Sequence, residues 1–312
     1  MNRQKSMQWM TAPLFCIALT ACGCRTEIPV AFEENLVHAK KWELQNDTSM
    51  DQVVSDTRWA LEELFGTPDE PKLPEVITSD EDLKTLISME NLQAASGHES
   101  IEGRGLYRTY CARCHGITGN GRGETAALVE PYPRDYRPGI FKFKSTTRGA
   151  MPLKSDLAKV IKHGIPGSSM VPEYQLPSGK VGPLDDEVID KLVDYVIYLT
   201  IRGQVERANY DAAAMELDLE SGDRIINPAH ATATNEADKE KFAEDWELLT
   251  DSVADAAGAW LDAEDEIVEV KVPDDMAIPS THEEMTQMLA GDQGEELSKS
   301  IERGRELFVG TV

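Results

Sequence analysis

Cys111-Ala112-Arg113-Cys114-His115 is the stretch of this sequence that decides the fold. Two thiols lie three positions apart, and a histidine follows the second thiol directly. This C-x-x-C-H spacing is the attachment sequence for c-type haem, because the two thiols can form thioether bonds along one edge of the porphyrin. The adjacent histidine is then held beneath the iron as its proximal ligand. The motif therefore predicts one haem c attached to Cys111 and Cys114, with His115 as an axial ligand.

Two other uses of paired cysteines fit the surrounding sequence poorly. A zinc site needs a second pair of ligands at similar spacing, which this sequence lacks. A thioredoxin-like redox pair needs a preceding strand, whereas residues 102–110 have a helical pattern. The five cysteines also fall in two distant clusters, which is not the pattern of a disulfide scaffold.

Residues 98–203 resemble a class I cytochrome c domain. The resemblance begins at Gly103 and Tyr107, passes through the haem motif and ends in the helical stretch 184–202. Residues 164–170, with the sequence GIPGSSM, are similar to the methionine loop in the small cytochrome subunits of cbb-type terminal oxidases. The resemblance implies an all-α fold, in which Gly103 and Tyr107 face Tyr195 where the first and last helices cross.

Three residues after the haem motif could supply the sixth iron ligand, namely Met151, His163 and Met170. Met170 lies in the Gly/Pro/Ser loop before the last helix, as the resemblance requires, although Val171 stands where the family usually has proline. Met151 could be an ordinary loop residue, and His163 at a helix end suits the helix dipole without any iron. We expect Met170 to be the ligand, because this loop can bring its thioether across the haem face. Histidine and methionine together raise the reduction potential and close the iron to other ligands, which favours electron transfer.

The charge of the chain excludes some classes of partner. The 312 residues carry a net charge of −25, which argues against nucleic acid, because phosphate binding needs a basic surface. The charge is uneven, with +3 over residues 98–203, −10 over 25–97 and −15 over 211–270. No stretch approaches the ~20 uninterrupted apolar residues of a membrane-spanning helix, so a polytopic membrane protein is excluded.

The N-terminus has the pattern of an export signal. Arg3 and Lys5 precede a mostly apolar run, residues 9–21, which is too short to span a bilayer comfortably. The run ends in Leu-Thr-Ala-Cys22, which resembles the lipobox of bacterial lipoproteins. The resemblance implies that Cys22 is acylated and tethers the protein to the periplasmic side of a bacterial membrane; the alternative is an ordinary cleaved signal peptide. Cys16 would be lost on cleavage, and Cys24 has no evident partner.

Five segments follow from these patterns. They are a lipoprotein signal peptide (1–21), an acidic helical spacer (22–97), the cytochrome c domain (98–203), an acidic helical insert and linker (204–280) and the start of a truncated second cytochrome c domain (281–312). The last segment is predicted because Gly-Arg-Gly-Leu-Tyr at 103–107 recurs as Gly-Arg-Glu-Leu-Phe at 304–308. The recurrence predicts a second haem in the full-length protein; the alternative is a chance similarity over five positions.

Basic residues gather within the otherwise acidic chain between positions 134 and 162. They are Arg134, Arg137, Lys142, Lys144, Arg148, Lys154, Lys159 and Lys162, opposed only by Asp135 and Asp156. One interpretation is a solvated surface that also balances the haem carboxylates, and another is a docking surface for an acidic redox partner. In a third, the acidic segment 211–270 folds over this face.

The expected function is electron transfer by a membrane-tethered cytochrome of a respiratory chain, rather than catalysis. The expected partner is a redox protein, such as a terminal oxidase or a dehydrogenase. The alternative is a redox subunit of an enzyme, such as a dihaem cytochrome c peroxidase, in which one haem needs an open or displaceable ligand. A structural lipoprotein, in which haem serves folding alone, is the third class.

Overall fold

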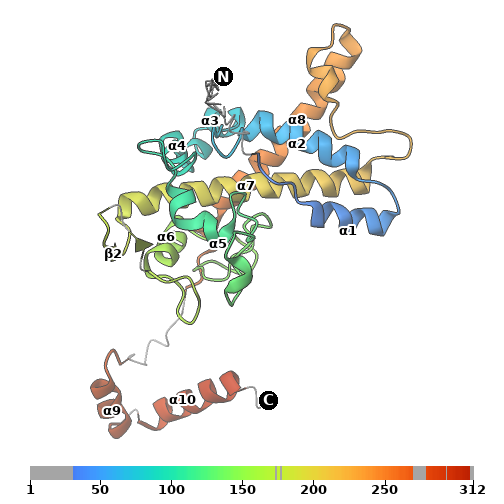
Figure 1. The fold of residues 1–312 in the computed structure, drawn as a ribbon. Coiled ribbons are helices and arrows are strands. Elements are labelled where there is room, and N and C mark those ends of the chain that lie inside the picture. Colours follow the sequence, from blue (N-terminus) through green and yellow to red (C-terminus); the bar gives the residue numbers. More distant parts are fainter. Residues whose placement is uncertain (1–30, 173, 176–177, 270–278, 293, 310–312) are drawn as a thin grey trace, which may run out of the picture.

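The computed structural model describes residues 31–172, 174–175, 178–269, 279–292 and 294–309 (Figure 1). Across these ranges the chain is mostly helical, which confirms the all-α prediction. The one sheet in the described ranges is a hairpin of two short antiparallel strands, β1 (Tyr174–Gln175) and β2 (Val181–Gly182). None of the helices in these ranges is both long enough and apolar enough to cross a bilayer. The predicted signal peptide, with Cys16, Cys22 and Cys24, lies outside the described residues.

The helices follow one another in a simple order along the chain. The α-helices are α1 (Leu36–Asn46), α2 (Asp51–Phe65), α3 (Glu75–Ser79), α4 (Met89–Ala95), α5 (Arg113–His115), α6 (Lys154–His163), α7 (Asp186–Glu216), α8 (Glu236–Leu261), α9 (His282–Ala290) and α10 (Gly294–Val309). The short turns are η1 (Leu83–Thr85), the π-helical η2 (Arg108–Ala112), η3 (Ala126–Leu128), η4 (Pro228–Thr232) and η5 (Asp262–Glu266).

The long helix α7 runs through the middle of the molecule, with α5 and α6 near one end and α1 near the other (Figure 1). The sequence predicted a helix that ends at Arg202, but α7 continues without a break to Glu216. Its buried face continues as well, because Val205 belongs to the main core and Tyr210 and Ala213 pack with Ala39 of α1 and Val53 of α2. The two halves of α7 therefore pack against different neighbours through one continuous buried face.

Gly203 lies in α7 at the point where the loop that contains Arg137 packs directly on the helix. A Cβ atom at this position would come within 2.5 Å of the Arg137 Cα. Glycine in a helix interior costs about 1 kcal/mol relative to alanine, so it disfavours the helix locally. Here its lack of a side chain instead lets a loop lie directly on α7, while packing on both sides maintains the helix.

The N-terminal acidic segment is helical, as predicted, and it packs against α7. Leu61 and Phe65 of α2 are completely buried in the main hydrophobic core, which also contains Tyr107 before the haem motif. The helix ends at Gly66, whose φ of +71° suits glycine and whose Cβ would lie 2.2 Å from the Glu70 carbonyl oxygen. The part of this segment from Leu61 to Ala95 thus shares one core with the haem motif.

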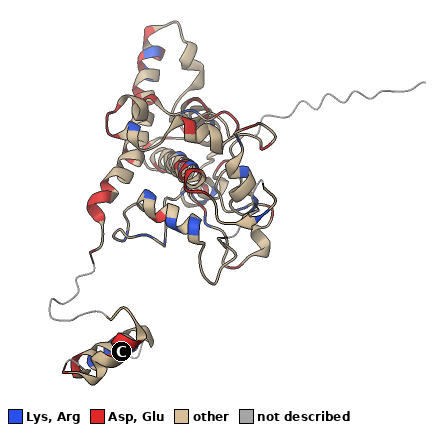
Figure 2. Cartoon of the chain, turned by 90° about the vertical axis from the view of Figure 1, so that its left-hand side faces the viewer, with Lys and Arg blue, Asp and Glu red and all other residues tan. Residues whose placement is uncertain are grey.

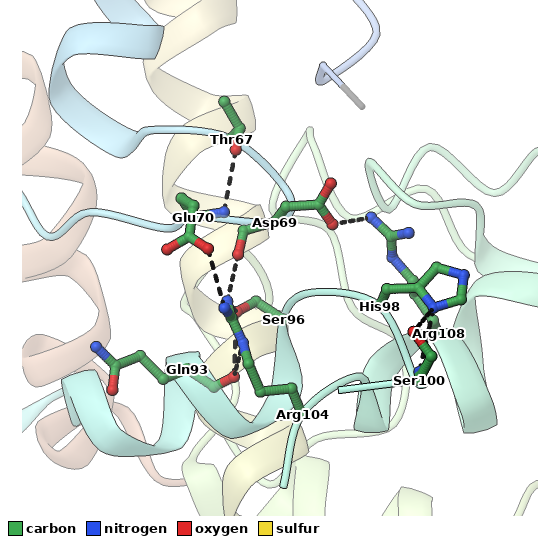
Figure 3. A network of polar contacts seen from close by, with 9 residues as sticks. All are labelled: Thr67, Asp69, Glu70, Gln93, Ser96, His98, Ser100, Arg104 and Arg108. Carbon is green, nitrogen blue, oxygen red and sulfur yellow. Dashed lines mark hydrogen bonds and ion pairs between the residues drawn. The ribbon is translucent and has the colours of Figure 1, made fainter. Parts of the chain in front are cut away.

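Arg104 joins this N-terminal segment to the start of the haem-motif helix (Figure 3). Its guanidinium donates to the Gln93 carbonyl at 3.1 Å, to the Glu70 carboxylate at 3.0 Å and to the Ser96 hydroxyl at 3.0 Å. It also donates to the backbone carbonyl of Asp69. Arg108, one turn further along the helix, pairs with the Asp69 carboxylate. The two arginines therefore fix the residues before the motif against the loop that follows α2.

The acidic segment 204–280 contains the helix α8 and the turn η5. Trp246 packs against Phe242 on the same helix and against Trp59 of α2, with ring centroids 5.8 and 6.1 Å apart. These rings therefore join α8 to α2. Leu249 and Val253 lie buried further along the same face.

The recurring motif at 304–308 lies within α10, which packs against α9. In the first copy the equivalent tyrosine, Tyr107, is 1% exposed, whereas Phe308 is 93% exposed. The first copy also begins with a turn, in which Gly103 and Gly105 have φ values of +77° and +79°. The two copies share a helical second half, but only the first contributes an aromatic side chain to a core.

Candidate haem site

The C-x-x-C-H motif closes a helix that begins at Leu106 and contains the π-helical turn η2. Such wide turns are frequent at functional sites, because they displace side chains from the regular helical spacing. Cys111 packs against the main core, and the Cys114 Sγ lies 3.2 Å from the Thr125 hydroxyl. Both cysteines are free thiols, and burial raises the pKa of the Cys111 thiol to about 12. The thiol therefore stays protonated at neutral pH.

The loop after the motif folds back on the end of this helix. The amides of Gly121, Gly123 and Thr125 donate to the carbonyls of His115, Cys114 and Arg113, at 2.9, 3.1 and 3.0 Å. Helix ends leave such carbonyls without partners, so the loop satisfies them and fixes the orientation of the motif. Gly123 must be small, because a Cβ there would lie 2.4 Å from the Ala112 carbonyl.

His115 is held in the form that can bind a metal. Its Nδ1 lies 3.1 Å from the Arg134 carbonyl oxygen, so Nδ1 carries the proton and Nε2 keeps its lone pair. Burial lowers the pKa of His115, which keeps the imidazole neutral near pH 7. The ring also stacks on Tyr136, with centroids 4.9 Å apart and planes 18° apart. One oriented imidazole beside two free thiols is a donor set that fits a c-type haem.

Tyr107 and Tyr195 meet where the motif helix crosses α7, as predicted. Their ring centroids are 4.9 Å apart, and the Tyr107 hydroxyl donates to the Gly116 carbonyl at 3.0 Å. Burial raises the pKa of Tyr107 well above its usual value, so the hydroxyl remains a donor. The prediction for Gly103 is wrong: it lies in a turn before the helix, and a Cβ there would meet no described atom within 4 Å. The resemblance placed it on a helix that begins three residues later.

The loop that contains Met170 is tied to its own backbone. The Ile165 amide donates to the Met170 carbonyl at 2.7 Å, and the Met170 amide donates to the Ser168 hydroxyl at 3.1 Å. The Met170 side chain is half-buried and packs against the main core. Four residues later, Tyr174 packs edge-on against Tyr110 of the motif helix at 5.8 Å. The loop therefore leads directly onto the helix that carries the cysteines.

The other two candidates for the sixth ligand differ from Met170 in burial. Met151 is buried in the main core, and its carbonyl accepts a 2.7 Å hydrogen bond from the Thr146 hydroxyl. His163, at the end of α6, is exposed. Met170 and Met151 thus reach the same core, while His163 faces solvent; the choice of Met170 stays a prediction.

The eight basic residues of the segment 134–162 do not form one surface. Arg137 is buried, pairs with Asp135 at 2.8 Å and lies against Gly203. Lys154 pairs with the buried Asp194 at 2.9 Å. Lys162 pairs with Asp186 at 2.6 Å, and Lys144 donates to the carbonyls of Thr147 and Ala150. Apart from the paired Lys154 and Lys162, the exposed basic residues are Lys142, Arg148 and Lys159.

The end of the acidic segment lies against part of this region. The Thr147 amide donates to the Glu266 carbonyl at 2.8 Å, and the Val268 amide donates to the Ser145 carbonyl at 2.9 Å. Figure 2 shows the acidic turn η5 just before the grey trace that leads to α9. Burial lowers the pKa of Lys144, although Asp156 and Glu266 act in the opposite direction. The acidic segment therefore covers the 145–147 loop through residues 266–268.

Several residues of the site escaped the sequence analysis. The Arg134 carbonyl orients His115, and Tyr136 stacks on it. The role of a backbone carbonyl does not depend on the type of side chain, so residue types could not predict it. The only clue in the sequence is the spacing of 19 residues between His115 and Arg134. Trp260 of α8 reaches the same core from outside the domain, and helical spacing alone gave it no special role.

A helix that ends in a C-x-x-C-H motif and crosses α7 is the arrangement expected of a c-type cytochrome domain. Residues 99–196 match the family described as cytochrome C oxidase, cbb3-type, subunit III. A solved structure, the Kuenenia stuttgartiensis reducing HAO-like protein complex Kustc0457/Kustc0458, is 26% identical and gives a TM-score of 0.28. That likeness covers 36% of this chain and 43% of the other. No curated protein matches the chain. The cytochrome c domain implies covalently bound haem, electron transfer and a redox partner protein.

Proposed function

We propose that this protein is a lipid-tethered cytochrome on the periplasmic side of a bacterial membrane, passing single electrons to or from a respiratory-chain partner. The observation that carries the proposal is the geometry of His115, which is neutral, half-buried and fixed through Nδ1 beside two free thiols. Haem bound there supplies a reversible one-electron couple. A terminal oxidase or a dehydrogenase is the partner that such a carrier serves.

Each site residue has a separate task in this proposal. Cys111 and Cys114 would hold the group by covalent bonds, and His115 would bind the iron through Nε2. Met170 would bind the iron through its sulfur, from a loop that hydrogen bonds hold in shape. A haem held by both histidine and methionine would favour electron transfer over peroxide or oxygen chemistry.

Lys142 and Arg148 are the exposed charges that could steer an acidic partner, since both are exposed close to the covered loop. Reversing both to Glu should slow electron transfer to an acidic partner by about tenfold at low salt, because long-range attraction raises association rates. The difference should shrink as ionic strength rises, because exposed charges are screened beyond about 8 Å at physiological salt. Stopped-flow rates against ionic strength measure this.

Lys239→Glu with Lys299→Glu is the matched control, since both lysines are exposed on other helices, at 50% and 73%. This variant has the same net charge as the first and should transfer electrons faster than it at low salt. Equal rates for the two variants at every salt concentration would remove the steering role of Lys142 and Arg148.

Cys22→Ser should release the protein from membranes into the soluble periplasmic fraction, because acyl chains are the proposed anchor. Fractionation followed by immunoblotting measures the distribution, and mass spectrometry of the N-terminal peptide tests acylation directly. Cys24→Ser is the control and should stay with the membrane. A Cys22→Ser protein that still sediments with membranes would show that another anchor holds it.

A further inference from the structure

Trp260 carries a polar group that the surrounding protein does not satisfy. It lies in the last turn of α8, is only 4% exposed and belongs to the main core. Its indole Nε1 is buried and finds no acceptor among the described residues. Leaving a buried N–H without an acceptor costs about 1–3 kcal/mol, so such groups usually meet a partner in the working protein.

A continuous line of aromatic rings leads from Trp260 to the proposed iron ligand. Trp260 packs edge-on against Phe141, with centroids 5.9 Å apart. Phe141 stacks on Tyr136 at 6.2 Å, and Tyr136 stacks on His115 at 4.9 Å. The tryptophan therefore approaches the haem site from the side of Phe141, although α8 lies outside the residues that match the cytochrome family.

Trp260 also lines a groove of about 500 Å³ beside the start of α6, together with Pro152, Leu153, Lys154 and Glu264. Pro152 and Leu153 directly follow Met151 in the core. Trp260 thus contacts both this groove and the line of aromatic rings that leads to His115.

Haem c brings two carboxylates, which are strong acceptors and must be satisfied where they are buried. Two nearby cationic groups already have partners, because Lys144 donates to backbone carbonyls and Lys154 pairs with Asp194. The Trp260 indole N–H is a buried donor beside Phe141 that has no acceptor among the described residues.

We propose that Trp260 forms part of the wall of the haem site and that its indole N–H donates a hydrogen bond to a haem carboxylate. The proposal rests on haem attachment at Cys111 and Cys114. It makes Trp260 a positioning residue, supplied by the acidic segment to the cytochrome domain. Part of the haem environment then comes from a helix more than 140 residues after the motif in sequence.

Trp260→Phe in the haem-loaded full chain tests the hydrogen bond, since it removes the N–H and keeps an aromatic ring. A donor stabilises the carboxylate anion, so its loss should raise the carboxylate pKa. The fall of midpoint potential with pH should therefore move to higher pH in the variant. Spectroelectrochemical titration between pH 5 and pH 9 measures the shift.

Other titrating groups around the groove are present equally in both proteins. They are Lys144, Lys154, Asp156, Asp194, Glu264 and Glu266. The difference between the two curves therefore reports on the indole. Trp246→Phe on the same helix is the matched control and should leave the curve unchanged, because Trp246 packs against Trp59 and Phe242 instead.

Indole N–H signals of the unmodified protein give an independent readout that needs no variant. In ¹⁵N-labelled protein, the Trp260 signal should move between the oxidised and reduced states far more than the Trp246 signal. It should also exchange slowly with water. Superimposable potential curves for Trp260→Phe and the parent, or equal redox shifts at both indoles, would overturn the proposal. A parent protein without bound haem would instead refute the proposed function.

Discussion

Changing both Cys111 and Cys114 to alanine is expected to abolish haem staining of the denatured protein. Staining under denaturing conditions detects only covalently bound haem, and these two thiols are the proposed points of attachment. Each single change removes one thioether and should reduce the staining without abolishing it. A gel loaded with equal amounts of protein and stained for haem measures all three variants.

His115→Ala should have an equally large effect, because the motif helix contains no other histidine that could bind the iron. His163→Ala is the matched control, since His163 is exposed at the end of α6 and should leave staining unchanged. Cys24→Ser serves the same purpose for the cysteines. Undiminished staining in the double cysteine variant would contradict the attachment site.

The second large effect is expected at Met170. Met170→Ala should remove the weak sulfur-to-iron absorption at the red end of the oxidised spectrum. It should also lower the midpoint potential by about 0.1 V or more, because a thioether ligand stabilises ferrous iron. Absorption spectra and redox titration of the haem-loaded protein measure both changes.

Met151→Ala separates the role of a ligand from the role of a core residue. Met151 is 7% exposed, and truncating a buried methionine to alanine costs about 2–5 kcal/mol of unfolding free energy. We therefore expect Met151→Ala to lower the free energy of unfolding while keeping the red absorption band. Loss of that band in Met151→Ala, with its retention in Met170→Ala, would assign the sulfur ligand to Met151.

The sequence was a good guide wherever short-range patterns decide the structure. The haem motif and the contact of Tyr107 with Tyr195 follow from local spacing or from the family resemblance. The end of α7 could not be predicted in this way. Its continuation beyond Arg202 depends on α1 and α2, which cover Tyr210 and Ala213 from a distant part of the chain.

Charges were harder to interpret than apolar residues. A count of lysines and arginines does not show which have partners, so Arg137 was predicted with the surface residues. In the structure it is buried, because Asp135 lies two positions before it and Gly203 leaves space for it. The polar contacts of Arg104 were missed for the same reason, since Glu70 and Gln93 come from a separate segment.

The uninterrupted course of α7 has a thermodynamic consequence. Its first half forms the core around Tyr195, and its second half forms the core around Tyr210. Because one rigid helix belongs to both cores, melting either of them exposes residues on which the other depends. We therefore expect binding energy gained at the haem motif to stabilise α1 and α2 as well, which end 65 and 46 residues before Cys111. The cofactor and the acidic helices would then stabilise one another as a single cooperative folding unit.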